Sequence, residues 1–160
     1  MNKVPNAVLD SISFEIIPDD VTPKILSPLN GNDISITCFV ISAGSFASRY
    51  WLGLSRAVGN QWGRSVNDSG FRYPTDELDP GEEPFEGVEM YVVENVIYVD
   101  LEAFERVMLR FFKAAIESAV TKNDPVLQEE WWPEFLQNVA RVEERCARAI
   151  DGERPASLEQ

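Results

Sequence analysis

The fold is decided by residues 88–121, which read VEMYVVENVIYVDLEAFERVMLRFFKAAIESAVT. Apolar residues alternate on either side of Glu94-Asn95, and this pattern predicts two strands joined by a tight hairpin. Asp100 is a suitable N-cap for a helix from Leu101 to about Thr121. The apolar residues that recur on the buried side of this helix are Phe104, Met108, Phe111, Phe112, Ala115 and Ala119. The segment therefore predicts an antiparallel hairpin that runs directly into a long amphipathic helix.

A further helical segment follows. Asn123-Asp124-Pro125 is expected to end the first helix and to start the next, with proline in the first helical position. Pro133 is expected to kink that helix or divide it. Beyond Pro133 the apolar residues at helical spacing are Phe135, Leu136, Val139, Val142, Cys146 and Ile150. This part of the chain is therefore predicted to be helical up to about Gly152.

The residues before the hairpin predict two more strands and another helix. Residues 9–17 and 33–42 read LDSISFEII and DISITCFVIS, and both have strand patterns, the second typical of a central strand. Ser45 is a plausible cap for a helix through about Arg64. The predicted apolar stripe of that helix is Phe46, Tyr50, Leu54, Val58 and Trp62, widened by Trp51 and Leu52. Residues 63–87 are rich in Gly, Pro, Asp and Glu and are predicted to be a long irregular stretch.

The order of elements is strand, strand, helix, strand, strand, helix, helix, which predicts an α+β fold. We expect one domain over residues 1–152, with an antiparallel or mixed sheet of about four or more strands and about three helices packed against it. Residues 153–160 are predicted to be a frayed tail.

The charge restricts the class of partner. The chain has 27 acidic and 14 basic residues and a net charge of −13, which repels nucleic acids and anionic membranes and attracts basic proteins or cations. It has no histidine, so serine–histidine and cysteine–histidine nucleophile systems are excluded. Cys38 and Cys146 are interpreted as buried thiols. With no transmembrane run and no signal peptide pattern, the sequence predicts a cytoplasmic protein.

The best candidate site is residues 76–89, DELDPGEEPFEGVE. A solvated loop is one interpretation, and a docking surface for a basic protein is another. A calcium site is disfavoured, because the acid spacing does not match an EF-hand loop, and we predict no metal ion and no other cofactor. The carboxylates predicted to bind a partner are Asp76, Glu77, Asp79, Glu82, Glu83, Glu86 and Glu89.

Three other sets of residues are candidates for a functional site, and each also has a structural explanation. Trp62 is expected in the core, while of the adjacent Trp131 and Trp132 one is expected to pack and the other to be exposed as an interface residue. The carboxylate pairs 82–83 and 129–130 do not converge on a substrate, so no catalytic residue is assigned. Arginines 141, 145 and 148 share one side of the last helix and are attributed to the helix dipole and to pairing with acids 143 and 144.

Two segments resemble the immunity proteins of bacterial contact-dependent growth inhibition systems, particularly those paired with ribonuclease toxins. One is MYVVENVIYVDLEAFERVMLRFFKAAIE, and the other is NDPVLQEEWWPEFLQNVARVEER, a proline-started acidic helix with tryptophan. The resemblance implies a cytoplasmic protein that binds the C-terminal nuclease domain of a cognate toxin and masks its active site or substrate groove. It also implies that the protein needs no catalysis and no cofactor.

The leading hypothesis is therefore an immunity protein that neutralises a basic toxin, a nuclease or ribonuclease, in a 1:1 complex through its acidic surface. We expect it to bind no nucleic acid and no membrane. The alternative is an acidic adaptor or secretion chaperone for another basic protein. An enzyme of the carboxylate–metal hydrolase class is the third and least favoured class.

Overall fold

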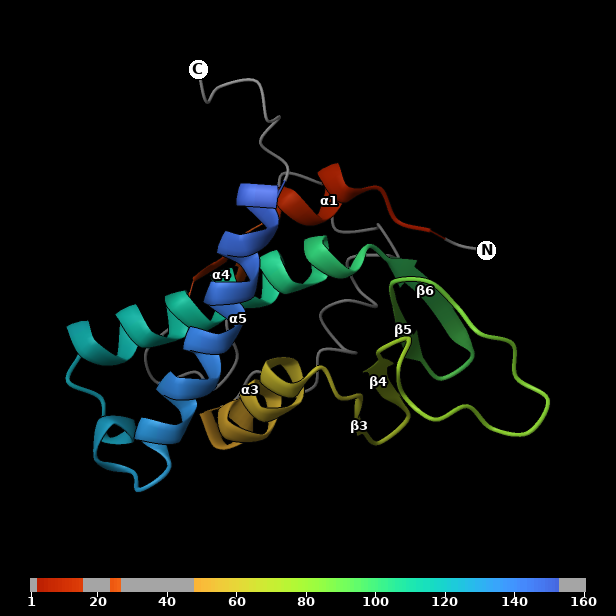
Figure 1. Ribbon diagram of the computed structural model, residues 1–160. Coiled ribbons are helices and arrows are strands. Elements are labelled where there is room, and N and C mark those ends of the chain that lie inside the picture. Colours follow the sequence, from red (N-terminus) through yellow and green to blue (C-terminus); the bar gives the residue numbers. More distant parts are fainter. Residues whose placement is uncertain (1–2, 16–23, 27–47, 153–160) are drawn as a thin grey trace, which may run out of the picture.

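The computed structural model describes residues 3–15, 24–26 and 48–152 of the 160-residue chain. Its elements are α1 (Asn6–Asp10), β1 (Ser13–Glu15), β2 (Lys24–Leu26), η1 (Ser48–Tyr50), α3 (Trp51–Asn60), β3 (Arg64–Val66), β4 (Ser69–Arg72), β5 (Val88–Val92), β6 (Asn95–Val99), α4 (Leu101–Thr121), η2 (Pro125–Gln128) and α5 (Trp132–Gly152) (Figure 1). The predicted α+β class is confirmed. The predicted tail, residues 153–160, lies outside the described residues.

A four-stranded antiparallel sheet, in the order β3-β4-β5-β6, forms one side of the fold. Its register sets Phe71, Met90 and Ile97 in one row across three strands, and all three are buried. Because successive side chains alternate between the two faces of a sheet, the neighbouring row of Arg72, Glu89 and Tyr98 lies on the opposite face. The sheet therefore has one apolar face against the helices and one polar face.

The N-terminal part of helix α4 packs against the apolar face, and the helix confirms the prediction made from residues 88–121. The Asp100 carboxylate accepts a hydrogen bond from the amide of Ala103 at 3.1 Å, as an N-cap should. The ring centroid of Phe104 lies 5.1 Å from that of Phe71, which joins helix to sheet. All six residues predicted for the buried side of this helix are buried. The hairpin prediction is also confirmed, with its turn at Val93-Glu94 rather than Glu94-Asn95.

Helix α5 crosses both α3 and α4 (Figure 1). Phe135 is its central contact, since its ring lies 6.0 Å from Trp51 on α3 and 5.8 Å from Phe112 on α4. The expectation that Pro133 kinks or divides a helix is wrong. Pro133 is the second residue of α5, where a missing amide costs no internal hydrogen bond, and the interruption falls before Trp132 instead.

The prediction of a strand over residues 9–17 is only partly correct. Residues 6–10 form α1, which follows the extended backbone of Pro5, and residues 13–15 form a strand. Residues 16 and 17 of the predicted strand lie outside the described residues. Arg110 on α4 donates hydrogen bonds to the carbonyls of Leu9 and Ile12 at 2.7 and 3.1 Å. This tertiary contact holds the turn between α1 and β1. The local sequence pattern does not predict the turn, because Arg110 lies 98 to 101 residues farther along the chain.

The predictions for residues 45–87 need two corrections. Helix α3 ends at Asn60, because Gln61 adopts a left-handed conformation with φ of 55°, so Arg64 belongs to a strand and not to the helix. The stretch predicted to be irregular contains β3 and β4, which are too short for a clear alternating pattern. Ser45, Cys38 and the strand predicted over residues 33–42 lie outside the described residues.

Candidate functional site

The acidic stretch predicted as a site, residues 76–89, is called the acidic loop here. It leaves the sheet after β4 and returns to it in β5, forming the long projecting loop in Figure 1. The structure divides its seven carboxylates into three groups, according to whether they pair with an arginine, fix the backbone or remain open. This division decides which of them can act on a partner.

Arg72 pairs with two of the seven. Its Nε lies 3.0 Å from Oε1 of Glu89, and its Nη1 lies 3.0 Å from Oε2 of Glu82. The register places Arg72 directly opposite Glu89 in the sheet, while Glu82 approaches from the loop. The Tyr98 hydroxyl donates to the other oxygen of Glu89 at 3.1 Å. We call Arg72, Glu82 and Glu89 the arginine clamp, because it fastens the middle of the loop to the polar face of the sheet.

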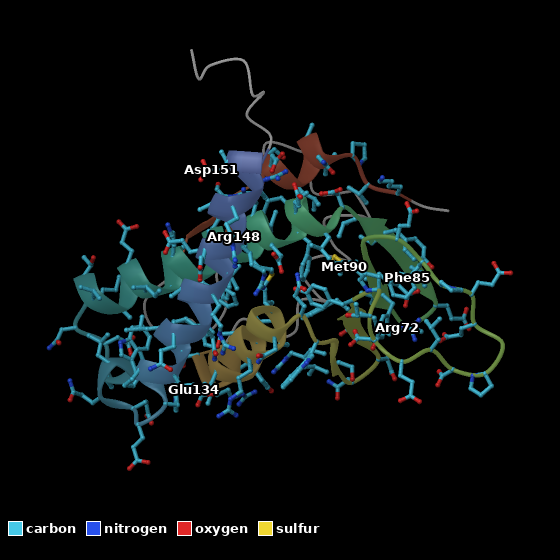
Figure 2. All side chains as sticks on the ribbon, viewed as in Figure 1. Arg72, Phe85, Met90, Glu134, Arg148 and Asp151 are labelled. Carbon is cyan, nitrogen blue, oxygen red and sulfur yellow. The ribbon has the colours of Figure 1, made fainter. Side chains whose placement is uncertain are left out.

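The clamp is supported by Phe85. The guanidinium carbon of Arg72 lies 5.4 Å from the centroid of the Phe85 ring, within cation–π range. That ring lies 5.9 Å from the ring of Tyr98 on β6. Figure 2 shows the labelled Arg72 and Phe85 close together beside the loop. The loop is therefore packed onto the sheet by an aromatic side chain as well as by charge.

Two local turns fix the backbone of the loop. Near its start, the Asp76 carboxylate accepts a hydrogen bond from the amide of Tyr73 at 2.7 Å. Farther on, the amide of Asp79 donates to the Glu82 carboxylate at 2.8 Å, and the amide of Glu82 donates to the Asp79 carbonyl at 3.0 Å. Gly81, with φ of 90°, occupies a conformation that an L side chain rarely adopts. Acidic side chains thus shape this loop.

The pKa of Glu82 reflects these bonds. Hydrogen bonds from Arg72, and then from the Asp79 amide, lower the pKa of Glu82 below its ordinary value. The same hydrogen bond to Glu82 is the main reason that the pKa of Arg72 is raised. Glu82 and Arg72 are therefore both charged at neutral pH.

Four carboxylates remain open: those of Glu77, Asp79, Glu83 and Glu86. All four side chains are exposed, and within the described residues none of them forms an ion pair. They project from a backbone that the clamp and the two turns hold in place. We call them the open carboxylates, and they form the part of the predicted site that is available to a cationic partner.

A buried polar network lies behind the root of the loop, and sequence reasoning missed it. The Glu105 carboxylate on α4 accepts a hydrogen bond from Nη2 of Arg145 on α5 at 2.8 Å and another from Nε2 of Gln61 at 3.1 Å. The Tyr73 hydroxyl, at the end of β4, lies 3.5 Å from the same carboxylate oxygen. Arg145 also donates to the carbonyls of Val58 and Gly59 at 2.6 and 2.8 Å, which caps the C-terminal end of α3.

This network corrects the role assigned to Arg145. It does not pair with Glu143 or Glu144; its partner is forty residues earlier in the chain. Burial alone would lower the pKa of Arg145, but the hydrogen bonds and charge of Glu105 outweigh burial and raise it. Burial, and then the charge of Glu105, raise the pKa of Tyr73. Only the predicted pairing of Arg148 with Glu144 is present, at 3.9 Å on the surface.

The tryptophans are distributed differently from the prediction. Trp62 is 60% exposed and is not a core residue, because α3 has already ended when the chain reaches it. Trp132 is buried and Trp131 is partly buried; both rings pack on Phe135, at 5.1 and 6.1 Å. Neither of this adjacent pair is thus the exposed interface residue that the sequence suggested. Leu136 and Ile150, expected on the buried stripe of α5, are 39% and 56% exposed.

Within the described residues, no group of three or more Cys, Asp or Glu side chains is arranged to hold a metal ion. None of the described helices is both long and apolar enough to span a bilayer. Cys146 is half-buried beside Glu105 and Arg145, and burial raises the pKa of its thiol. A raised pKa makes a thiol less reactive at neutral pH.

No protein-family model matches the chain, and the comparisons with curated proteins and with solved structures find no match. The resemblance to immunity proteins therefore stays a prediction that depends on the two quoted segments.

Proposed function

We propose that this chain is an inhibitory binding protein that neutralises a cognate basic toxin domain, a nuclease or ribonuclease, by covering its active site with the acidic loop. The observation that carries the proposal is the set of four open carboxylates on a loop whose backbone is already fixed. A nuclease binds a polyanion, so its substrate groove is basic. An ordered acidic surface resembles that polyanion and attracts the same groove.

Preorganisation is the second support. A mobile acidic loop would lose conformational entropy on binding, whereas a loop held by the arginine clamp has already lost most of it. The clamp uses Glu82 and Glu89 for this purpose, so these two carboxylates are expected to act on the loop rather than on the partner. The proposal assigns no chemistry of its own to the chain, and one chain is expected to bind one toxin domain.

The test is co-expression of the chain with the basic nuclease domain encoded beside its gene. We expect a 1:1 complex, loss of nuclease activity, and an association rate that falls steeply with salt. Replacing Glu77, Asp79, Glu83 and Glu86 by lysine should slow association by on the order of 10 to 10³-fold. The matched control replaces Glu117, Glu129, Glu130 and Asp151, four exposed acids away from the loop, with the same change in net charge.

If both quadruple variants lose affinity equally, general charge rather than the loop attracts the partner. If neither loses affinity or salt dependence, the loop is only a solvated connection and the proposal is wrong.

An adaptor or secretion chaperone for another basic protein is the alternative with the same charge. A chaperone for an unfolded chain presents a continuous apolar surface. The large apolar side chains that are exposed within the described residues instead lie apart along the chain, at Trp62, Val93, Val120, Leu136 and Ile150. This distribution favours a folded partner. Binding of the unfolded toxin domain more tightly than the folded one would support the alternative.

A further inference from the structure

A hollow of about 300 Å³ opens where the sheet meets the root of the acidic loop. Its lining includes Trp62, which connects α3 to β3, Tyr91 on β5 and Asp76 at the start of the loop. Arg72 of the clamp also lines it, so the hollow and the acidic loop are continuous. The Trp62 side chain is 60% exposed.

Two glycines lie against side chains that line this hollow: Gly63, which lines it as well, and Gly70, which pairs with Tyr91 in the sheet. A Cβ atom on Gly63 would lie 2.6 Å from the Asp76 carboxylate, and a Cβ atom on Gly70 would lie 2.8 Å from the Tyr91 hydroxyl. Both distances are too short for real side chains. The Asp76 carboxylate and the Tyr91 hydroxyl therefore lie directly against the backbone of Gly63 and Gly70.

The charges around the hollow decide what it can accept. Arg64 also lines the hollow, but its guanidinium packs against Gly53 of α3 and lies 6.0 Å from the ring of Tyr50. The charge of Arg72 is more than balanced by Glu82 and Glu89. The remaining charged group in the lining is the Asp76 carboxylate, which shares the hollow with the aromatic side chains of Trp62 and Tyr91.

We propose that this hollow receives a lysine or arginine side chain of the basic partner. The cation would stack on Trp62 and Tyr91 and pair with Asp76, an arrangement that combines cation–π attraction with a charge-assisted hydrogen bond. A second copy of this chain is a poor occupant, because two molecules of net charge −13 repel each other. The inference rests on the proposed function and adds the chemical group by which the partner is recognised.

The test uses a short peptide, acetyl-Gly-Arg-Gly-amide, and its citrulline counterpart, which has the same shape without the charge. The protein carries 5-fluorotryptophan, and Trp62→Phe assigns the Trp62 fluorine resonance. At low salt the arginine peptide should shift this resonance saturably, and the citrulline peptide should not. Asp76→Asn keeps an oxygen that can accept from the Tyr73 amide but removes the charge, and it should weaken binding about tenfold. Glu117→Gln on α4 is the matched control and should change nothing.

A Trp62 resonance that responds to neither peptide, or equally to both, overturns the inference. This result is separable from failure of the proposed function. A toxin domain that still binds and still depends on the open carboxylates leaves the proposed function standing while the hollow loses its role. Conversely, the arginine peptide could shift the resonance while no toxin domain binds. The hollow is then a site for a cationic side chain, but that side chain does not come from a toxin.

Discussion

Arg145 on α5 and Glu105 on α4 form an ion pair in the interior, with 2.8 Å between Nη2 and Oε1. The Glu105 side chain is 4% exposed and that of Arg145 is 24% exposed. A buried pair of this kind costs desolvation when it forms, but losing one partner leaves an uncompensated charge in the interior. The pair therefore makes the packing of α3, α4 and α5 mutually dependent.

Replacing Arg145 by methionine should lower the free energy of unfolding by about 3 kcal/mol, because Glu105 is left buried without its cation. Urea denaturation measures this change. The matched control is Arg148→Met on the same helix, whose pairing with Glu144 is exposed and 3.9 Å long, and which should cost less than about 0.5 kcal/mol. Restoration of stability by the double change Arg145→Met with Glu105→Leu would confirm that the lone charge is the cause; equal losses in both single variants would contradict it.

Phe135 connects α5 to the rest of the core. Its ring contacts Trp51, Phe112, Trp131 and Trp132, and it is fully buried. Phe135→Ala should cost about 3–5 kcal/mol, since it removes these contacts and leaves a cavity. The neighbouring Leu136→Ala, at a position 39% exposed, should cost far less. Thermal unfolding followed by circular dichroism compares the two, and similar losses would show that the described core is wrong here.

The arginine clamp makes a prediction about pH. Because the pKa of Glu82 is lowered in the folded loop, the contribution of this carboxylate to loop order is present above the pKa of an unfolded glutamate. It is lost as the pH falls through the lower, folded value. The carboxyl carbon resonance of Glu82 should therefore titrate at lower pH in the wild-type protein than in Arg72→Gln. The control is Arg56→Gln, which removes an arginine paired with Glu134 and should leave the Glu82 midpoint unchanged. Identical midpoints for Glu82 would mean that the clamp is not formed in solution.

The buried hydroxyl of Tyr73 should make the stability of the protein depend on pH in the alkaline range. Its pKa is raised because the hydroxyl is buried and faces Glu105, so the folded protein keeps this phenol neutral where an unfolded tyrosine ionises. The unfolded chain then binds fewer protons than the folded one, and stability should fall as the pH rises above about 10. Tyr73→Phe should flatten this alkaline loss in chemical denaturation curves. It should also leave the amplitude of the reversible phenol titration at 295 nm unchanged, and a reduced amplitude would show that Tyr73 ionises in the folded state.

The sequence by itself determined the elements whose signals are local. The alternation around Glu94-Asn95, the cap at Asp100 and the spacing from Phe104 to Ala119 each lie within one helix or one strand pair. The structure confirms all three, with the hairpin turn one residue earlier. The negative charge of the acidic loop could also be predicted, because it follows from the residue types alone. What local patterns could not show was where α3 ends, because a single left-handed residue, Gln61, decides it.

Only the tertiary structure decided how the acidic residues are used. Strand register brings Glu89 opposite Arg72, and chain reversal brings Glu82 to the same guanidinium. Two of the seven carboxylates therefore pair with arginine, Asp76 fixes the start of the loop, and four remain open. Helix packing likewise brings Arg145 to Glu105 across forty residues of chain and leaves Trp62 exposed beside Asp76. These outcomes depend on distances between residues far apart in the chain. Side-chain chemistry and periodicity carry no information about such distances until the core has packed.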